Sequence, residues 1–183
     1  MAHNPWIRRS RRVAYENPWI AVQHDEVTRP DGQPGIYGVV HFKNRAVGVV
    51  ARDAQGRVIL VGQYRYALDV YSWEIPEGGG PFSEDPLAAA QRELREETGL
   101  SARRWTQLGI THTSNSVSDE EARYYLAEEL EQGEAEPEGT EQLALRWVEF
   151  DEALRMVHTG EITDALSVVA LLQAARADQT QKD

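Results

Sequence analysis

Three glutamates, Glu93, Glu96 and Glu97, constrain this chain more than any other feature of its sequence. On an α-helix these positions are i, i+3 and i+4, so the three carboxylates fall within an arc of about 100°. Like charges at this spacing destabilise a helix by roughly 0.2–0.5 kcal/mol per pair unless something neutralises them. Arg92 and Arg95 offset part of the repulsion, and a divalent cation with oxygen ligands offsets far more. The segment therefore favours a helix that carries a cation site.

The helix is predicted over Asp85–Thr98, because its ends carry the expected signals. Asp85 suits the N-cap, Pro86 the first helical position, and Gly99 the position after the last turn. The glycine-rich stretch at 78–81 is expected to break the preceding strand pattern. The positions i, i+3 and i+7 predict a buried stripe formed by Leu87, Ala90 and Leu94.

The rest of the chain alternates between short strands and a helical end. Aromatic and β-branched runs predict strands at 13–15, 19–27, 37–42, 46–51, 58–64, 71–75, 105–111, 122–127 and 143–150. Two helices are predicted at about 151–159 and 164–177, and an acidic loop at 128–141. This is a mixed α/β pattern without the regular alternation of a doubly wound fold.

A carboxylate-rich helix taken alone is usually a solvated face with pairs such as Arg92–Glu96. Here the surrounding residues follow the pattern G-x5-E-x7-R-E-U-x-E-E-x-G-U, where U is aliphatic, over 23 residues. The matching positions are Gly78, Glu84, Arg92, Glu93, Leu94, Glu96, Glu97, Gly99 and Leu100. This pattern resembles the signature of the Nudix hydrolases.

The resemblance implies a fold, a domain organisation and a chemistry. The fold would be the Nudix α/β/α sandwich with a mixed central sheet, preceded by an N-terminal antiparallel β extension. Residues 1–44 would form the extension and residues 45–183 the hydrolase domain. The family hydrolyses a nucleoside diphosphate linked to another moiety, with Mg²⁺, or Mn²⁺ in its place, as the cofactor.

The resemblance also assigns roles within the motif. Glu93 and Glu97 would be the main metal ligands, and Glu96 a ligand or water-holding catalytic group. Gly78 would begin the loop that turns the backbone toward the metal, and the carbonyl of Glu77 would be a further ligand. The remaining motif residues, which would be structural, are Gly99 and the ion-paired Glu84 and Arg92.

Features around the motif resemble the ADP-ribose and nucleoside-diphosphate-sugar pyrophosphatase branch. They are Gln63-Tyr64-Arg65, Trp73-Glu74-Ile75-Pro76, Ser118-Asp119-Glu120 and Gly160-Glu161-Ile162-Thr163-Asp164-Ala165. The branch implies a homodimer built through the N-terminal strands, with substrate contacts from Arg65, Glu74 and Trp19, and a stacking role for Tyr37. Ordinary sheet packing or a dimer contact is the alternative role for these aromatic residues. Asn115 stands where the ADP-ribose branch usually has proline, which brings other nucleoside diphosphate sugars into consideration.

The catalytic base is expected in the acidic loop before the last strand. Glu141 is the first candidate and Glu138 the second, and Glu120 is a further one. A base must come within about 3 Å of the attacking water, which spacing alone does not establish. His112 is expected near the site, in a structural role.

Composition excludes several other classes of protein. There is no Cys, so thiol catalysis, disulfides and Cys-ligated zinc are excluded. The net charge of −11 repels a phosphate backbone, so we expect no nucleic-acid partner. No apolar run approaches 18 residues and no apolar segment follows the arginines at 8–12, so we expect a cytoplasmic protein without a membrane partner.

Two other functions compete with hydrolysis of a nucleotide sugar. One keeps the enzyme but changes its substrate to a dinucleoside polyphosphate, an oxidised nucleotide or capped RNA. The other is a non-catalytic Nudix domain that senses a ligand. The intact motif disfavours the sensor, because regulatory versions usually carry a degraded one.

Overall fold

The computed structural model describes residues 3–133 and 143–180. It divides into two compact units. One contains the chain up to Asn44 together with His112–Glu121, and the other contains Arg45–Thr111 and the chain from Ala122 onward. We describe each unit by itself.

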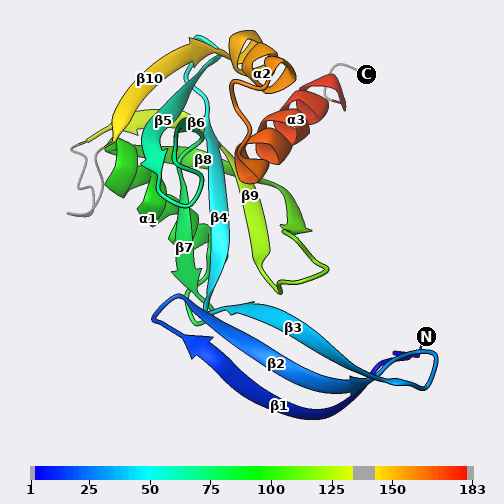
Figure 1. Cartoon of the computed structure of the whole chain (residues 1–183). Helices are drawn as coiled ribbons and strands as arrows, with labels where there is room; N and C mark the ends of the chain where they lie inside the picture. The colour runs from blue at the N-terminus through cyan, green and yellow to red at the C-terminus, as the bar shows by residue number, and fades with distance from the viewer. Residues whose placement is uncertain (1–2, 134–142, 181–183) are drawn as a thin grey trace. The chain divides into compact units, whose positions relative to one another are not determined.

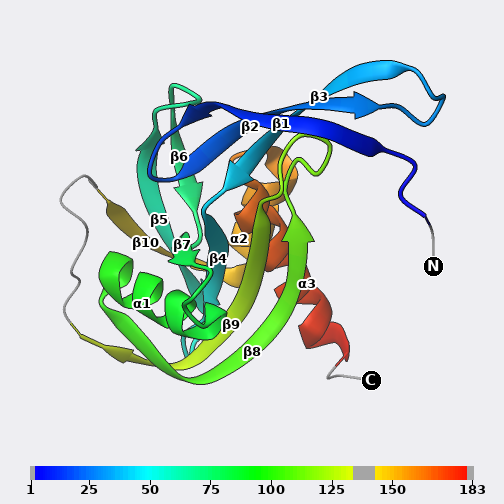
Figure 2. The same cartoon turned by 90° about the horizontal axis from the view of Figure 1, so that it is seen from below.

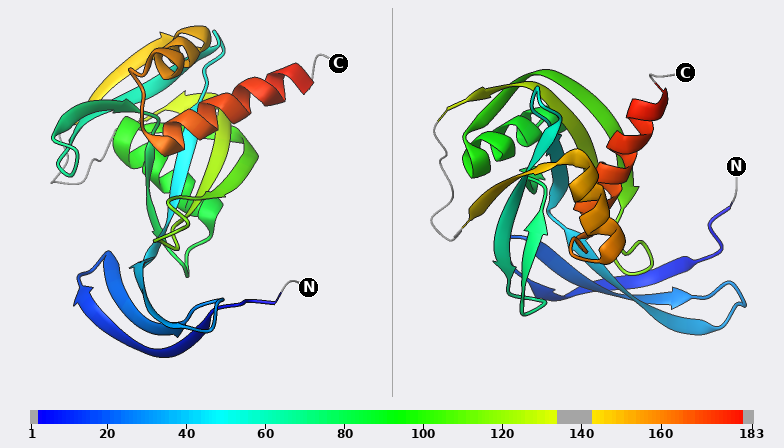
Figure 3. Two further views of the ribbon diagram at one scale, coloured as in Figure 1. Left: turned by 45° about the vertical axis from the view of Figure 1, so that its right-hand side comes forward. Right: turned by 90° about the horizontal axis from the view of Figure 1, so that it is seen from above.

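The first unit is an antiparallel sheet of three strands in the order β1-β2-β3, which Figure 3 shows as a long curved ribbon. The strands are β1 (Ile7–Glu16), β2 (Ile20–Thr28) and β3 (Pro34–Phe42). The Asn17 side chain accepts from the backbone N–H groups of Trp19 and Ile20, which fixes the first turn. The segment 112–121 joins this unit through a hydrogen bond from the Phe42 N–H to Asp119 (2.9 Å). The expected N-terminal antiparallel sheet is therefore confirmed.

A partly buried ion pair ties β1 to β2 in this unit. Arg11 Nε donates to Asp25 Oδ1 at 2.6 Å, and Nη2 donates to Oδ2 at 2.7 Å, the two-pronged geometry that suits a guanidinium. The hydrogen bond and charge of Arg11 hold the pKa of the Asp25 carboxyl below its usual value, although burial opposes this. The pair lets a buried carboxylate remain charged.

The second unit holds two sheets, ordered β10-β5-β6 and β7-β4-β9-β8. Strands β4 and β9 run parallel while β5 pairs antiparallel with β6 and β10, so the predicted mixed arrangement is confirmed. The strands are β4 (Asn44–Ala51), β5 (Arg57–Arg65), β6 (Val70–Glu74), β7 (Glu77–Pro81), β8 (Leu100–His112), β9 (Glu121–Gln132) and β10 (Ala144–Glu149). The helices are α1 (Pro86–Thr98), α2 (Phe150–Thr159) and α3 (Ala165–Thr180).

Alternation along β4 separates two hydrophobic cores. Val47 and Val49 pack with Ala90 and Leu94 of α1, whereas Val50 packs in a different cluster with residues of α2 and α3. Successive side chains of a strand point to opposite faces, so one strand supplies both cores. Figures 1 and 2 show α1 on one side of β4 and β9 and α3 on the other. This is the expected α/β/α layering.

The predicted ends of α1 are confirmed. The Asp85 side chain accepts from the N–H groups of Leu87 and Ala88, and Gly99 takes the left-handed conformation with φ of 72°. Leu94 is fully buried, but Leu87 is only partly buried. The helix is thus held at both ends, which fixes the rotation of its carboxylate face.

The structure corrects two boundaries. The glycine-rich stretch does not break the sheet but forms β7, because its missing side chains let it lie against α1; a Cβ at Gly80 would come within 2.6 Å of the Ala89 Cβ. The first part of the predicted acidic loop, 128–132, is strand β9. Arg104 of β8 pairs with Glu128 of β9 at 2.8 Å, and this ion pair neutralises the Glu128 charge within the sheet.

Within the described part of the chain, no helix combines the length and the apolar composition needed to cross a membrane.

Candidate active site

The carboxylates of α1 face β7 and are held by specific contacts. Glu97 is only 4% exposed, and its Oε2 accepts from the Glu77 backbone N–H at 3.1 Å. Arg92 Nη1 donates to Glu93 Oε1 at 2.9 Å and to Glu96 Oε2 at 2.8 Å. Arg92 thus links Glu93 with Glu96, while Glu97 is bonded to the backbone of β7.

Gly78 gives the Glu93 carboxylate its space. A Cβ built at Gly78 would lie 2.3 Å from Glu93 Cδ and 2.3 Å from Oε2, far inside van der Waals contact. Only glycine allows the carboxylate to approach the β7 backbone this closely. The close approach of the Glu93 carboxylate explains why the motif has glycine at position 78.

Arg92 connects the middle of α1 with β7 and with the turn that follows β7. Its Nη2 lies 3.2 Å from Glu84 Oε2 and 3.0 Å from the Gly79 carbonyl oxygen. The predicted Glu84–Arg92 ion pair is thus present. Since the same guanidinium contacts Glu93 and Glu96, it links the loop to the carboxylate face.

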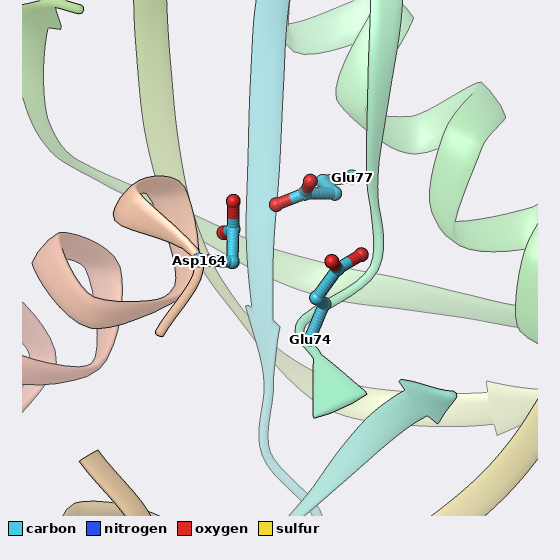
Figure 4. A group of neighbouring side chains, drawn as sticks. All are labelled: Glu74, Glu77 and Asp164. Carbon is cyan, nitrogen blue, oxygen red and sulfur yellow. The ribbon is translucent and has the colours of Figure 1, made fainter. Parts of the chain in front are cut away.

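A second acidic group lies at the junction of β6 and β7. Arg65 Nη2 donates to Glu74 Oε2 at 2.5 Å and to Glu77 Oε1 at 2.7 Å, while Gln63 donates to Glu74 at 3.1 Å. Glu74 is 1% exposed. Figure 4 shows Glu74, Glu77 and Asp164 with their carboxylates directed into one space, and one oxygen of each lies within 4.8 Å of the others.

Asp164 belongs to this group although the sequence pattern assigns it no role of its own. Its Oδ2 accepts from the Ser167 N–H at 2.7 Å, which is the hydrogen bond of an N-cap at the start of α3. The segment 160–165 resembles the family. However, Asp164 and Glu77 are 87 positions apart, so no local sequence pattern predicts that their carboxylates lie close together. Burial raises the pKa of the Glu77 carboxyl well above its usual value, and the charges of Asp164 and Glu74 add to this.

The other predicted site residues belong to the first unit or lie beyond the described residues. Trp19 belongs to the first unit and is 67% exposed, just before β2. In the same unit, Tyr37 donates to the Ser116 carbonyl oxygen and Glu120 accepts from Thr113. Glu138 and Glu141, the candidates for the catalytic base, lie outside the residues that the structure describes.

The residues on α1 and β7 fit a hard divalent cation. Carboxylate and backbone carbonyl oxygens are the donors that Mg²⁺ and Mn²⁺ prefer. The space above Gly78, into which Glu93 fits, brings a helix carboxylate against the backbone beside Glu77. This arrangement can hold a cation that in turn binds a diphosphate.

Comparison with known proteins agrees with this geometry. The NUDIX domain model matches residues 42–169, and the nucleoside diphosphate sugar hydrolase N-terminal domain matches residues 4–40. The chain is 35% identical to the ADP-ribose pyrophosphatase of Mycobacterium tuberculosis, covering 94% of this chain and 84% of that protein. It is 34% identical to the ADP-ribose pyrophosphatase of Bacillus subtilis, covering 86% and 87%.

Two further relatives widen the comparison. A CMP-5'-(N-acetyl-N-hydroxy-3-aminopropyl)phosphonate hydrolase of Streptomyces rubellomurinus is 28% identical, over 91% of this chain and 81% of that protein. A solved structure of an ADP compounds hydrolase superimposes with a TM-score of 0.88 over 99% of this chain and 98% of that one, at 19% identity. The latter likeness establishes the fold.

Proposed function

Since the chain belongs to the Nudix family, whose domain model matches residues 42–169, we propose that it hydrolyses the diphosphate bond of ADP-ribose or of a related nucleoside diphosphate sugar. The products are then a nucleoside monophosphate and a sugar phosphate. The observation that carries the proposal is the Glu93 carboxylate seated over Gly78, beside a Glu97 that is bonded to the Glu77 backbone.

Glu93 and Glu97 would hold the cation, with Glu96 and the Glu77 carbonyl oxygen as further ligands. The chemistry that Mg²⁺ or Mn²⁺ would supply here is neutralisation of the diphosphate charge and a lower pKa for the attacking water. Arg92 neutralises part of the carboxylate charge and keeps Glu93 and Glu96 in position when no substrate is bound.

Arg65 binds the diphosphate and Glu74 acts through it. The hydrogen bonds of Arg65 to Glu74 and Glu77 use Nε and Nη2, so these carboxylates leave the Nη1 edge to a substrate oxygen. The Arg65 side chain is 37% exposed, whereas Glu74 has almost no exposed surface. Glu74 is therefore a positioning residue rather than the direct contact expected from its place in the sequence.

The remaining roles rest on the family resemblance. Glu141, or Glu138 in its place, is proposed as the base that accepts a proton from the attacking water, and Glu96 as the group that holds this water. Trp19 is proposed to contact the base of the nucleotide. The N-terminal extension at 1–44 is proposed to serve substrate binding and dimerisation, and residues 45–183 the chemistry.

The substrate is tested by measuring phosphate release with a coupled phosphatase. The panel holds ADP-ribose, ADP-glucose, GDP-mannose, UDP-glucose, diadenosine polyphosphates and an oxidised dNTP. We expect turnover of at least one diphosphate sugar with Mg²⁺, loss of that activity in EDTA, and recovery when Mg²⁺ is restored. Turnover restricted to the polyphosphates or the oxidised nucleotide would contradict the substrate class. Silence across the panel, with ligands still raising the Tm, would indicate the sensor.

We also propose a cytoplasmic homodimer that forms through the first unit. Its sheet carries exposed apolar side chains, Ile36 at 67% exposure among them, on the part that matches the nucleoside diphosphate sugar hydrolase N-terminal domain. Ile36→Asp should convert the dimer to a monomer in light scattering, because a charge is costly in an apolar interface. Leu172→Asp, at an exposed position of α3, is the control and should remain dimeric. A dimeric Ile36→Asp variant would refute this interface.

A further inference from the structure

The Glu77 carboxylate has an oxygen that the fold leaves unsatisfied. Its Oε2 is buried and has no hydrogen-bond partner among the residues 3–133 and 143–180, while Oε1 accepts from Arg65. The side chain is only 9% exposed, and a buried polar atom without a hydrogen-bond partner is unfavourable. We propose that a divalent cation binds at this oxygen, held by the carboxylates of Glu77, Asp164 and Glu74, in a site separate from the carboxylate face of α1.

Three separate elements bring these ligands together. Glu74 ends β6, Glu77 begins β7 and Asp164 precedes α3, and all three belong to the second unit. One ligand oxygen of each residue lies within 4.8 Å of those of the other two. Figure 4 shows the three side chains close together. Ligands on opposite sides of a Mg²⁺ ion are about 4.2 Å apart, and those on a Ca²⁺ ion about 5 Å. The space between the three oxygens therefore fits either ion with little movement of the side chains.

The charges of the group also call for a divalent ion. Three carboxylates face one guanidinium, that of Arg65, so two negative charges are not balanced within the group. Glu74 already satisfies Arg65 with both oxygens, and Asp164 caps α3 through Oδ2. The oxygens have further lone pairs for a metal, because an ionised carboxylate accepts at about four sites.

A cation bound at this site would tie the junction of β6 and β7 to the start of α3.

The site does not depend on the proposed hydrolase function. It shares no carboxylate with Glu93, Glu96 and Glu97, although the Glu77 N–H donates to Glu97. Removal of either set of ligands should therefore leave the other cation in place, which allows the two sites to be counted separately.

The test is Mn²⁺ binding followed by the EPR signal of the free ion, without any nucleotide. Four proteins are compared: the wild type, Glu77→Gln/Asp164→Asn, Glu93→Gln/Glu97→Gln, and the variant with all four changes. We expect the second to bind one ion fewer than the wild type, the third to retain one ion, and the fourth to bind none. In the third variant, Mn²⁺ at a hundredfold excess over Kd should raise the Tm by roughly 5–10 °C.

The substitutions preserve the local contacts. The amide oxygen introduced by Asp164→Asn can still accept from the Ser167 N–H, and that of Glu77→Gln can still accept from Arg65. Glu131→Gln/Asp151→Asn removes the same charge from exposed positions of the second unit and should bind as the wild type does. If the Glu77 variant fails to fold, Asp164→Asn alone should weaken one Mn²⁺ by at least tenfold. Equal stoichiometry and affinity in the wild type and both Asp164 variants would overturn the proposal and indicate that a shared proton neutralises the group.

Discussion

Glu97→Gln is expected to lower kcat/KM for a nucleotide sugar by about 10²–10³-fold while leaving the fold intact, the range seen when one group that stabilises transition-state charge is removed. The reason lies in two different roles of the same side chain. The substituted amide keeps an oxygen that can accept from the Glu77 N–H, as the Glu97 carboxylate does at 3.1 Å, so the contact between α1 and β7 survives. The substitution removes the negative charge that favours binding of a hard cation.

The measurement combines steady-state kinetics with a Mg²⁺ titration. The variant should need a higher Mg²⁺ concentration for half-maximal rate, and its circular dichroism spectrum should match that of the wild type. Glu131→Gln, which removes a charge from an exposed position of β9, is the matched control and should retain full activity. Near-normal turnover by Glu97→Gln at low Mg²⁺ would remove Glu97 from the ligand set.

The local parts of the site are those that the sequence predicts well. The caps and the carboxylate face of α1 depend on residues within one helix, and helical geometry follows from a spacing of 3 or 4. The Glu84–Arg92 pair spans eight positions and follows from the motif. In each case the interacting residues are close enough along the chain for the pattern to contain their contact.

Strand β7 and the role of Asp164 escape sequence reasoning because tertiary contacts determine them. Glycine has a low strand propensity, and the stretch becomes a strand through its pairing with β4, with Gly80 close to Ala89 of α1. Asp164 meets Glu77 through the return of the chain after α2, which no spacing rule encodes. Arg65 is expected from the sequence as a substrate contact, but its pairing with Glu74 and Glu77 becomes evident only when β5, β6 and β7 are placed together.

Gly78→Ala should lower kcat/KM by about 10²-fold with little loss of stability. The new Cβ would overlap the Glu93 carboxyl group at 2.3 Å, and the end of a flexible side chain can move aside at small cost. The displaced carboxylate, however, no longer lies against the β7 backbone. A shift of about 1 Å in a catalytic arrangement is enough for a loss of this size.

Gly80→Ala, two residues along the same strand, should behave in the opposite way. Its Cβ would meet the Ala89 Cβ at 2.6 Å, and that methyl group cannot rotate out of the way. The free energy of unfolding should therefore fall by about 1–3 kcal/mol, as for other overpacked cores. Gly109→Ala is the control for strand glycines, because no neighbouring atom lies within 4 Å of the new Cβ. It should change neither kcat/KM nor the free energy of unfolding appreciably.

Urea unfolding and kinetics on the three variants separate the two roles of the glycines. If Gly78→Ala loses activity and Mg²⁺ affinity but retains its unfolding midpoint, then Gly78 is required because the Glu93 carboxylate occupies the place of a side chain. If Gly78→Ala instead loses stability as Gly80→Ala does and keeps its turnover, then the close approach of Glu93 to β7 is only a packing feature. In that case Glu93 would no longer be assigned as a metal ligand.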